Sequence, residues 1–449
     1  MKKLSVYQIF LIFILLFITL CVYLSILDAG YAPTDDWLML RSYSGSLKKI
    51  SLAYIVNTFK NFHEGLYHPL VTLSYTLEVN LFGFIPAVFH LDNILLHLIN
   101  IYLVFLIFFK LSKNNYWVGF IVAILFALHP TRVEAVAWIS ARKDLLYAPF
   151  YLLSILFYLK HNENSDSHSI FSVYMYISVL FFLLSCFAKS MAITLPFFLI
   201  LIDLYTNKFN KKKIKWYSIF FLIALIFVFL TFVSHYNTIT FDSNERLQLT
   251  FFKTCVNFIN AHFNIIFYLD KFLLPINLYC LYPIFYEETL YMPPWFIMYS
   301  PLVLYLMILL ICLSLKKTKV VFFGFMFFLV TIAPVSGVFP IGDFAVADRY
   351  TYLPYLGLFY IFAKFIVFLS YKYNNLIKAI TICFCILIEG TFGYLSYNRV
   401  IDWKTNHYGP PIKMKYYEFG ITKKTEKESI IIPKQQETYK RHVKIGIRK

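Results

Sequence analysis

The chain has 449 residues, of which 60% are hydrophobic, 20% aromatic and only 14% charged. A soluble protein of this length would carry about a quarter charged residues, so the composition excludes a soluble globular class. The formal net charge of +17 at pH 7 indicates attraction to a membrane surface, not to nucleic acid, because basic clusters lie between apolar runs. Many of these runs are about 17–25 residues long, enough to cross a hydrocarbon core. We therefore predict an all-α polytopic membrane protein.

The first apolar run, residues 7–27, follows Met1-Lys2-Lys3. A cleaved signal peptide has a shorter apolar core and small residues at its cleavage site. The run here is about twenty residues long, and the sequence after it matches a cleavage site poorly. We expect a retained signal anchor with a cytoplasmic amino terminus.

Charge distribution then fixes the expected topology. The basic segments 208–215, 316–319 and 372–378 are predicted to be cytoplasmic, because lysine and arginine collect on that side of membrane proteins. Counting crossings from a cytoplasmic amino terminus satisfies all three segments with about eleven spans. The predicted spans are 7–27, 88–109, 116–129, 145–160, 170–187, 190–206, 216–234, 296–315, 320–335, 353–370 and 379–397.

The segments between these spans place most polar residues on the opposite side of the membrane. The outer segments are 28–87, 130–144, 235–295 and 336–352. Within them, residues 70–84 and 261–280 are apolar but short, and are predicted to be interfacial or re-entrant helices. The expected organisation is a membrane domain over residues 1–400, followed by a basic polar tail over 401–449 that is partly disordered.

An acidic pair, Asp35-Asp36, follows the first span directly. Two adjacent carboxylates repel each other unless a cation, a proton or a hydrogen-bonding partner compensates. Such a pair could deprotonate an acceptor hydroxyl or hold a divalent cation, Mg²⁺ or Mn²⁺, through its oxygen atoms. It could also cap a surface helix that starts at Trp37, which is an ordinary use of aspartate.

Cationic residues occur in the other outer segments. Arginine can grip phosphate oxygens through two N–H groups, and lysine supplies a compact positive charge. Arg142-Lys143-Asp144 is either part of such a site or an interfacial anchor at the start of a span. His129-Pro130 could simply end a span, since proline stops helices. Lys189 lies in a short turn between two apolar spans, where an unpaired lysine is costly.

Several of these motifs together resemble the membrane part of the O-mannosyltransferases that carry transmembrane spans and tetratricopeptide repeats, and of their bacterial relatives. The stretches that carry the resemblance are His68-Pro69-Leu70 to Phe82-Gly83, Phe89 to His97, Ala127-Leu128-His129-Pro130, Val133 to Ser140, Arg142 to Leu146, Ala188-Lys189 with Leu195-Pro196, and Ala347 to Pro354. The segment from His129 to Asp144 is the most specific of them. The order and spacing match over roughly residues 5–405.

The resemblance implies a GT-C fold, the multi-span glycosyltransferase architecture that uses polyprenyl-phosphate-linked sugars. It also implies that Asp36 or Asp35 is the catalytic base or a metal ligand. Arg142, Lys143, Lys189 and Arg349 become candidate partners of the lipid phosphate. The full set of substrate-binding candidates is His68, His129, Glu134, Arg142, Lys143, Asp144, Lys189, Arg349 and Tyr350.

The chain departs from the family pattern in two places. The family usually has an acidic residue directly after the lysine at 189, whereas this chain has Ser190. The repeats that follow the last span in the family have no counterpart in residues 401–449. A glycan or lipid acceptor is therefore as plausible as a protein.

We expect an inverting glycosyltransferase that moves a sugar from a polyprenyl-phosphate donor to an acceptor hydroxyl, at the outer face of a bacterial inner membrane. Its expected partners are the lipid-linked sugar donor and membrane lipids, with the acceptor unknown and no nucleic acid. Two alternatives remain open: a transporter or lipid flippase in which the acidic pair binds a coupling cation, and a catalytically inactive scaffold. Transporters usually place ionisable residues near mid-membrane, whereas here they gather at one face.

Overall fold

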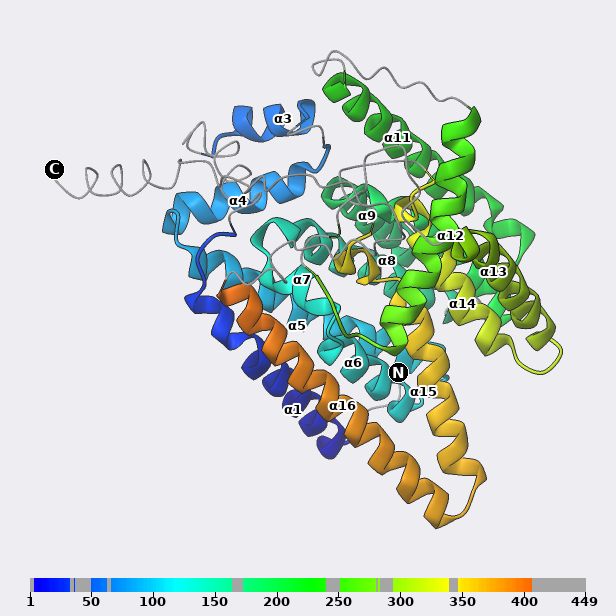
Figure 1. The fold of residues 1–449 in the computed structure, drawn as a ribbon. Helices are drawn as coiled ribbons and strands as arrows, with labels where there is room; N and C mark the ends of the chain where they lie inside the picture. The colour runs from blue at the N-terminus through cyan, green and yellow to red at the C-terminus, as the bar shows by residue number, and fades with distance from the viewer. Residues whose placement is uncertain are drawn as a thin grey trace, which may run out of the picture. The chain divides into compact units, whose positions relative to one another are not determined.

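The computed structural model describes residues 4–32, 36, 50–62, 66–163, 173–239, 251–279, 282, 294–338 and 346–405. All regular elements within these ranges are α or 3-10 helices (Figure 1). The first half contains α1 (Val6–Tyr23), η1 (Leu24–Asp28), α3 (Leu52–Lys60), α4 (Pro69–Phe82), α5 (Pro86–Leu111), α6 (Tyr116–Leu128), α7 (Arg132–Ala137), η2 (Ile139–Ala141), α8 (Arg142–Glu163) and α9 (Val173–Ala188). The second half contains η3 (Ser190–Thr194), α10 (Leu195–Thr206), η4 (Lys211–Lys213), α11 (Ile214–Ile239), α12 (Phe251–Leu273), α13 (Pro294–Ser314), α14 (Lys319–Ile332), η5 (Ala333–Val335), η6 (Asp348–Thr351), α15 (Tyr355–Lys372) and α16 (Asn375–Lys404).

The chain is an integral membrane protein. Within the described ranges, five helical segments are long and apolar enough to cross a membrane: Val6–Asp28, Pro86–Leu111, Lys211–Ser234, Tyr355–Lys372 and Asn375–Lys404. Each span predicted from the sequence falls on a helix, the remaining ones on α6, α8, α9, α10, α13 and α14. The all-α class is therefore confirmed. The two segments predicted to be interfacial or re-entrant fall on α4 and α12.

Capping side chains explain where four of these helices begin. Ser5, Asn115, Thr318 and Asn374 each accept a hydrogen bond from a backbone N–H in the first turn of α1, α6, α14 and α16. These side chains satisfy donors that the helix itself leaves unpaired. All four helices begin at the side that the charge pattern predicts to be cytoplasmic.

Close packing of small residues holds α15 against α14. Gly324 of α14 and Gly357 of α15 face each other so closely that a Cβ on Gly324 would lie 2.3 Å from the carbonyl oxygen of Gly357. Small residues at such crossings let two membrane helices approach backbone to backbone. The short helix η6, which precedes α15, contains the predicted site residues Arg349 and Tyr350. The contact between α14 and α15 therefore helps to fix where these two residues lie.

Most faces of α16 remain uncovered by protein, as expected for a helix bordered by lipid. Leu376, Ile386 and Leu387 are all at least 66% exposed. Figure 1 shows α16 running beside α1, and the two helices are in contact. The boundary predicted at residue 400 falls inside α16, which continues to Lys404. The tail beyond residue 405 lies outside the described residues and stays a prediction.

Candidate functional site

The segment 130–144 joins the outer parts of the chain. It begins where α6 ends at His129, forms the short helices α7 and η2, and enters α8 at Arg142. All of its residues except Lys143 are buried. Because its backbone breaks between α7 and η2, at Trp138, consecutive side chains leave it in different directions. It can therefore contact several outer segments at once.

Asp36 is bound to this segment by hydrogen bonds. Its Oδ1 accepts from the backbone N–H of Ser140 at 2.8 Å and from the Ser140 hydroxyl at 2.6 Å. Its Oδ2 accepts from the Ala32 N–H at 2.9 Å. Asp36 is only 1% exposed, and hydrogen-bond donors are what a buried carboxylate requires. Asp35 lies outside the described residues, so its predicted role stays a prediction.

Arg142 lies at the centre of a buried polar cluster. Its guanidinium forms ion pairs with Glu78 of α4 and, at 3.0 Å, with Asp92 of α5. Nε donates to the Asn93 side chain at 2.7 Å, and Nη2 donates to the Phe89 carbonyl at 2.8 Å. With this many acceptors already in place, the contacts favour a role in fixing α4 and α5 around the site over phosphate binding.

Lys189 forms an ion pair with Asp144. The sequence left the ion pairing of this lysine in doubt because Ser190 follows it, and the structure supplies the carboxylate from α8 instead. Burial lowers the pKa of Lys189, while the Asp144 carboxylate opposes that shift. Lys189 Nζ also lies 5.4 Å from the centre of the Tyr350 ring and 5.7 Å from that of Tyr147.

Arg349 forms a second ion pair, with Glu134 of α7, and its backbone N–H donates to the same carboxylate at 2.9 Å. Its guanidinium carbon lies 4.8 Å from the centre of the Trp138 ring and 5.0 Å from that of Tyr350. Burial alone would lower the pKa of Arg349, but the Glu134 carboxylate and other nearby groups outweigh burial and raise it.

The Tyr350 ring is therefore in contact with two cations, Lys189 and Arg349. Two polar atoms nearby are buried without a hydrogen-bond partner among the described residues, Asp144 Oδ2 and Trp138 Nε1. Lys189 Nζ donates one hydrogen bond within the same part of the chain, although an ammonium has three protons to donate. We call this group the paired-cation site: Glu134, Trp138, Asp144, Lys189, Arg349 and Tyr350.

The remaining predicted candidates lie apart from these two ion pairs or lack described contacts with them. His129 is fully buried, with Nδ1 2.9 Å from the Thr131 hydroxyl and Nε2 3.2 Å from the Phe272 carbonyl. His68 is buried at the start of α4, where its carbonyl accepts from Val71. Lys143 is half-buried. Their predicted contacts with substrate stay predictions.

Two further arginines in this region were not among the predicted site residues. Arg132 is fully buried and donates to the carbonyls of Thr351 at 3.0 Å and Tyr352 at 2.5 Å, which joins α7 to the end of η6. Arg399 of α16 pairs with Asp348 at 2.6 Å. A lone arginine in an apolar helix indicates a buried charged partner or a functional site. This pattern in the sequence could have identified Arg399.

No group of three or more His, Cys, Asp or Glu side chains within the described ranges is placed to hold a metal ion. Both carboxylate oxygens of Asp36 already accept hydrogen bonds, Oδ1 from Ser140 and Oδ2 from Ala32. Asp36 alone does not make a divalent-cation site, since Mg²⁺ prefers six oxygen ligands.

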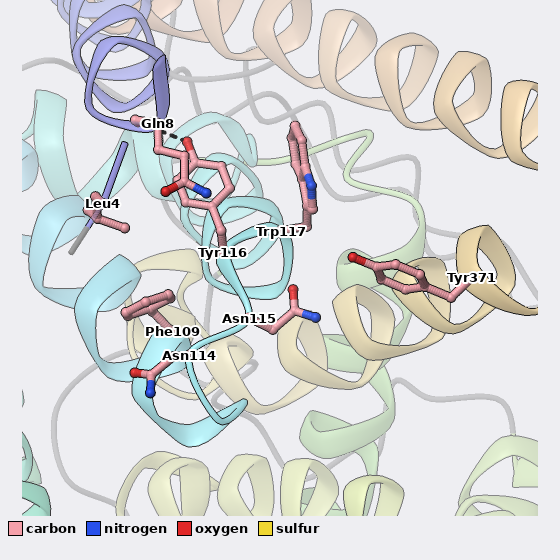
Figure 2. A pocket seen from close by; sticks show the side chains of 8 residues that line it. All are labelled: Leu4, Gln8, Phe109, Asn114, Asn115, Tyr116, Trp117 and Tyr371. Carbon is pink, nitrogen blue, oxygen red and sulfur yellow. Dashed lines mark hydrogen bonds between the residues drawn. The ribbon is translucent and has the colours of Figure 1, made fainter. Parts of the chain in front are cut away.

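A cavity of about 270 Å³ lies away from all of these residues, beside the starts of α1 and α6 and the end of α15 (Figure 2). Gln8, Asn115 and Tyr371 are among the residues that line it, and the Tyr116 hydroxyl donates to the Gln8 carbonyl at 3.0 Å. None of the predicted site residues lines this cavity.

Comparison with known proteins gives consistent sequence relatives. Protein O-mannosyl-transferase TMTC2 of Mus musculus is 37% identical over 131 residues, which is 28% of this chain and 13% of the relative. Protein O-mannosyl-transferase Tmtc1 of Drosophila melanogaster is 30% identical over 179 residues, covering 38% and 20%. Protein O-mannosyl-transferase F38B6.6 of Caenorhabditis elegans is 23% identical over 353 residues, covering 77% and 48%. The resemblance to the O-mannosyl-transferase family is confirmed.

The match to these O-mannosyl-transferases is partial, since the chain spans less than half the length of each of the three. No protein-family model matches the chain. Among solved structures, the apo oligosaccharyltransferase of Archaeoglobus fulgidus superposes with a TM-score of 0.48 and 12% sequence identity, over 90% of this chain and 56% of that one.

Proposed function

We propose that the protein is a GT-C glycosyltransferase that moves a sugar from a polyprenyl-phosphate donor to an acceptor hydroxyl, at the extracytoplasmic face of its membrane. One observation carries the proposal. At the paired-cation site, Lys189 and Arg349 both lie within 5.4 Å of the centre of the Tyr350 ring, and the neighbouring buried atoms Asp144 Oδ2 and Trp138 Nε1 have no described partner. Buried groups left unsatisfied within a protein are costly, so a polar ligand that completes their hydrogen bonds would be favoured here.

In this proposal the two cations receive the donor phosphate. Lys189 Nζ has two protons beyond the one directed at Asp144, and Asp144 keeps the ammonium in place. Arg349 is oriented by Glu134 through both its backbone and its side chain. Preorganised positive charge of this kind stabilises the negative charge that develops on a leaving phosphate. Phosphate binding here would also be favoured by the low dielectric of a buried site.

Asp36 serves the acceptor side. The acceptor oxygen forms a bond to the anomeric carbon as the bond from that carbon to the phosphate oxygen breaks. The acceptor's proton moves to Asp36, and the phosphate leaves with the bonding electron pair, paired with Lys189 and Arg349. A carboxylate is the acceptor that such a proton transfer requires, and the hydrogen bonds from Ser140 and Ala32 hold Asp36 in place. A single displacement inverts the anomeric configuration.

The Ser140 contacts connect the two halves of this arrangement. Ser140 binds Asp36, and Trp138, two residues earlier, packs against Arg349. The backbone between them is held in turn, since the Tyr75 hydroxyl donates to the Ile139 carbonyl at 2.6 Å. The segment 130–144 thereby fixes the base relative to the phosphate-binding cations. Such positioning is a large part of enzymatic rate enhancement.

The proposed acceptor is a hydroxyl group of a protein, glycan or lipid. The O-mannosyl-transferase relatives make mannose the first sugar to test. The mechanism uses no metal ion, and a requirement for Mg²⁺ or Mn²⁺ at Asp35 and Asp36 is tested by adding a chelator to the same assay. The transporter alternative is tested in parallel.

The decisive experiment is sugar transfer by purified protein in proteoliposomes. Polyprenyl-phosphate mannose is the donor, a hydroxyl-acceptor library is supplied, and products are identified by mass spectrometry. Asp36→Asn removes the base and is expected to reduce transfer at least about 100-fold, the lower end for general base catalysis. Asp28→Asn is the matched control, because Asp28 is also an outer carboxylate but is exposed and paired with Lys404 at 2.7 Å.

Transfer at the wild-type rate by the Asp36→Asn variant would overturn the assignment of the base. Proton- or sodium-coupled flux without any glycosyl product would instead favour a transporter.

A further inference from the structure

Two basic turns lie at the end of the helices that the charge pattern predicts to face the cytoplasm. The first turn, residues 207–215, connects α10 to α11, and the second, residues 315–319, connects α13 to α14. Neither turn contains an Asp or Glu. Their exposed lysines without an ion pair to a described residue are Lys208, Lys211, Lys212, Lys215, Lys316, Lys317 and Lys319.

A hydrogen bond links the two turns directly. Lys319 Nζ donates to the Asn207 side chain at 2.5 Å and approaches the Leu204 carbonyl at 3.5 Å. Asn207 ends α10 in the left-handed region, with φ +57°. Its side chain and the sharp turn that follows therefore bring residues of two distant parts of the sequence next to each other. The lysines of both turns form one surface.

Hydrogen bonds from a buried cluster hold the first turn in place. We call it the Asp203 cluster, and it consists of Asp203, Tyr158, Asn162, Lys213 and Tyr217. Asp203 is fully buried, and it accepts from Tyr158 at 2.6 Å, Asn162 at 2.8 Å, Lys213 at 2.6 Å and Tyr217 at 2.5 Å. Lys213 also donates to the Asn162 side chain and the Lys208 carbonyl. The backbone of the turn is thus held to α8, α10 and α11.

The acidic groups described beside the turns, Asp203 and Glu163, are already paired. The Asp203 carboxylate is occupied by its four donors, and Glu163 is paired with Lys110. Trp216 packs against Tyr176 with ring centres 5.2 Å apart, and Phe209 is exposed. Tryptophan and tyrosine beside lysine are typical of the level of lipid headgroups. A ligand of this surface would therefore be an anion at the membrane interface.

We propose that these two turns together bind the phosphate of an anionic phospholipid in the cytoplasmic leaflet. Basic surfaces between membrane helices recognise such headgroups through lysine–phosphate contacts, while the acyl chains stay in the bilayer. The occupant is a lipid because the lysines are flanked by interfacial aromatics and apolar helix faces. This site is separate from the paired-cation site and independent of the proposed transfer reaction.

The test counts bound phosphatidylglycerol and phosphatidylcholine on the full-length protein by native mass spectrometry. Lys212→Gln combined with Lys317→Gln removes one charge from each turn. Phosphatidylglycerol affinity is expected to fall about 30-fold, since each lysine near an anionic surface contributes about a factor of five. Lys372→Gln combined with Lys378→Gln is the control, with two exposed lysines removed from another turn at the same face.

A third variant separates a built site from diffuse attraction. Asn207→Gly removes the acceptor of Lys319 without changing charge, and glycine accepts the left-handed conformation. Phosphatidylglycerol affinity should fall about fivefold, as expected for one lost hydrogen bond. Size-exclusion profiles and circular dichroism check that all variants fold.

Equal losses in the control pair, or no loss with Asn207→Gly, would overturn the proposal. Displacement of the lipid by millimolar inorganic phosphate would overturn the lipid assignment.

Discussion

The paired-cation site and the Asp203 cluster share three residue types, and they differ in how completely the hydrogen bonds of these residues are satisfied. Each contains a buried aspartate, a lysine and at least one tyrosine. Asp203 accepts four hydrogen bonds, and Lys213 donates three. At the paired-cation site, Lys189 donates one, and Asp144 Oδ2 accepts none from the described residues.

This difference indicates opposite roles. A fully satisfied polar cluster stabilises one arrangement of the helices, because any change would leave a buried group unpaired. An incompletely satisfied cluster has donors and acceptors to offer a ligand. We therefore expect substitutions in the Asp203 cluster to change stability, and equivalent substitutions at the paired-cation site to change transfer.

The largest expected effect is on stability, from Asp203→Asn. The substitution leaves the half-buried Lys213 ammonium without the buried Asp203 carboxylate, which should lower the free energy of unfolding by about 3 kcal/mol, the lower end for a broken buried ion pair. Thermal unfolding in detergent measures this loss. Transfer per folded molecule should stay at the wild-type level. A variant with unchanged stability but lost transfer would reverse the assignment of the two regions.

Lys189→Gln is expected to have the next largest effect, a fall of about 100-fold in transfer, as for the loss of one preorganised group that stabilises developing charge. Lys213→Gln is the matched control, since it removes a lysine from the other cluster. It should alter unfolding temperature more than turnover. The distinction between the clusters fails if both variants lose transfer equally when corrected for folded protein.

Asp144→Asn should reduce transfer at neutral pH about tenfold, the value of one charge-assisted hydrogen bond that orients Lys189. Lys189 must be protonated to bind phosphate. Burial lowers the pKa of Lys189, and the Asp144 carboxylate opposes that effect. Removing the carboxylate lowers the pKa further, so the alkaline fall in kcat/KM should move to lower pH. If the alkaline fall in kcat/KM of Asp144→Asn stays at the same pH or moves to higher pH, the ion pair between Lys189 and Asp144 does not act on the pKa of Lys189.

The smallest effect should come from Ser140→Ala. The hydroxyl that donates to Asp36 is lost, while the Ser140 backbone N–H still donates to the same oxygen. We expect a fall of about fivefold in transfer, equivalent to roughly 1 kcal/mol. Ser154→Ala, in the buried contact between α8 and α9 where Ser154 bonds Ser178, is the control. Transfer losses of the same size in both variants would remove any special role for Ser140.

The spans could be predicted because each is a local property of a run of apolar residues. The prediction that Asp36, Arg142, Lys189 and Arg349 lie on one face also depended only on counting crossings. Segment 130–144 contacts the other three segments, through Ser140 with Asp36, Asp144 with Lys189 and Glu134 with Arg349, while the membrane face stays a prediction.

The identities of the partners could not be predicted, because they lie far apart in the sequence. The ion pairs of Arg142 with Glu78, 64 residues away, and with Asp92 could not be read from the sequence, and its contact with phosphate stays a prediction. Asp203 lies near the end of a predicted span, and a lone carboxylate in an apolar span indicates a buried partner. The partner, Lys213, lies in the turn that follows and could have been predicted. Trp138 lies in the stretch that carries the family resemblance, but its contact with Arg349 depends on how α7 packs against η6.

In the proposed reaction Lys189 binds the donor phosphate and Asp36 takes the acceptor's proton. One measurement separates these two roles. The affinity for polyprenyl-phosphate mannose, measured without acceptor, is compared for Asp36→Asn and Lys189→Gln. Asp36→Asn should bind the donor as tightly as the wild type, and Lys189→Gln should bind it at least about tenfold more weakly. Equal donor affinity in both variants would contradict this account of the site.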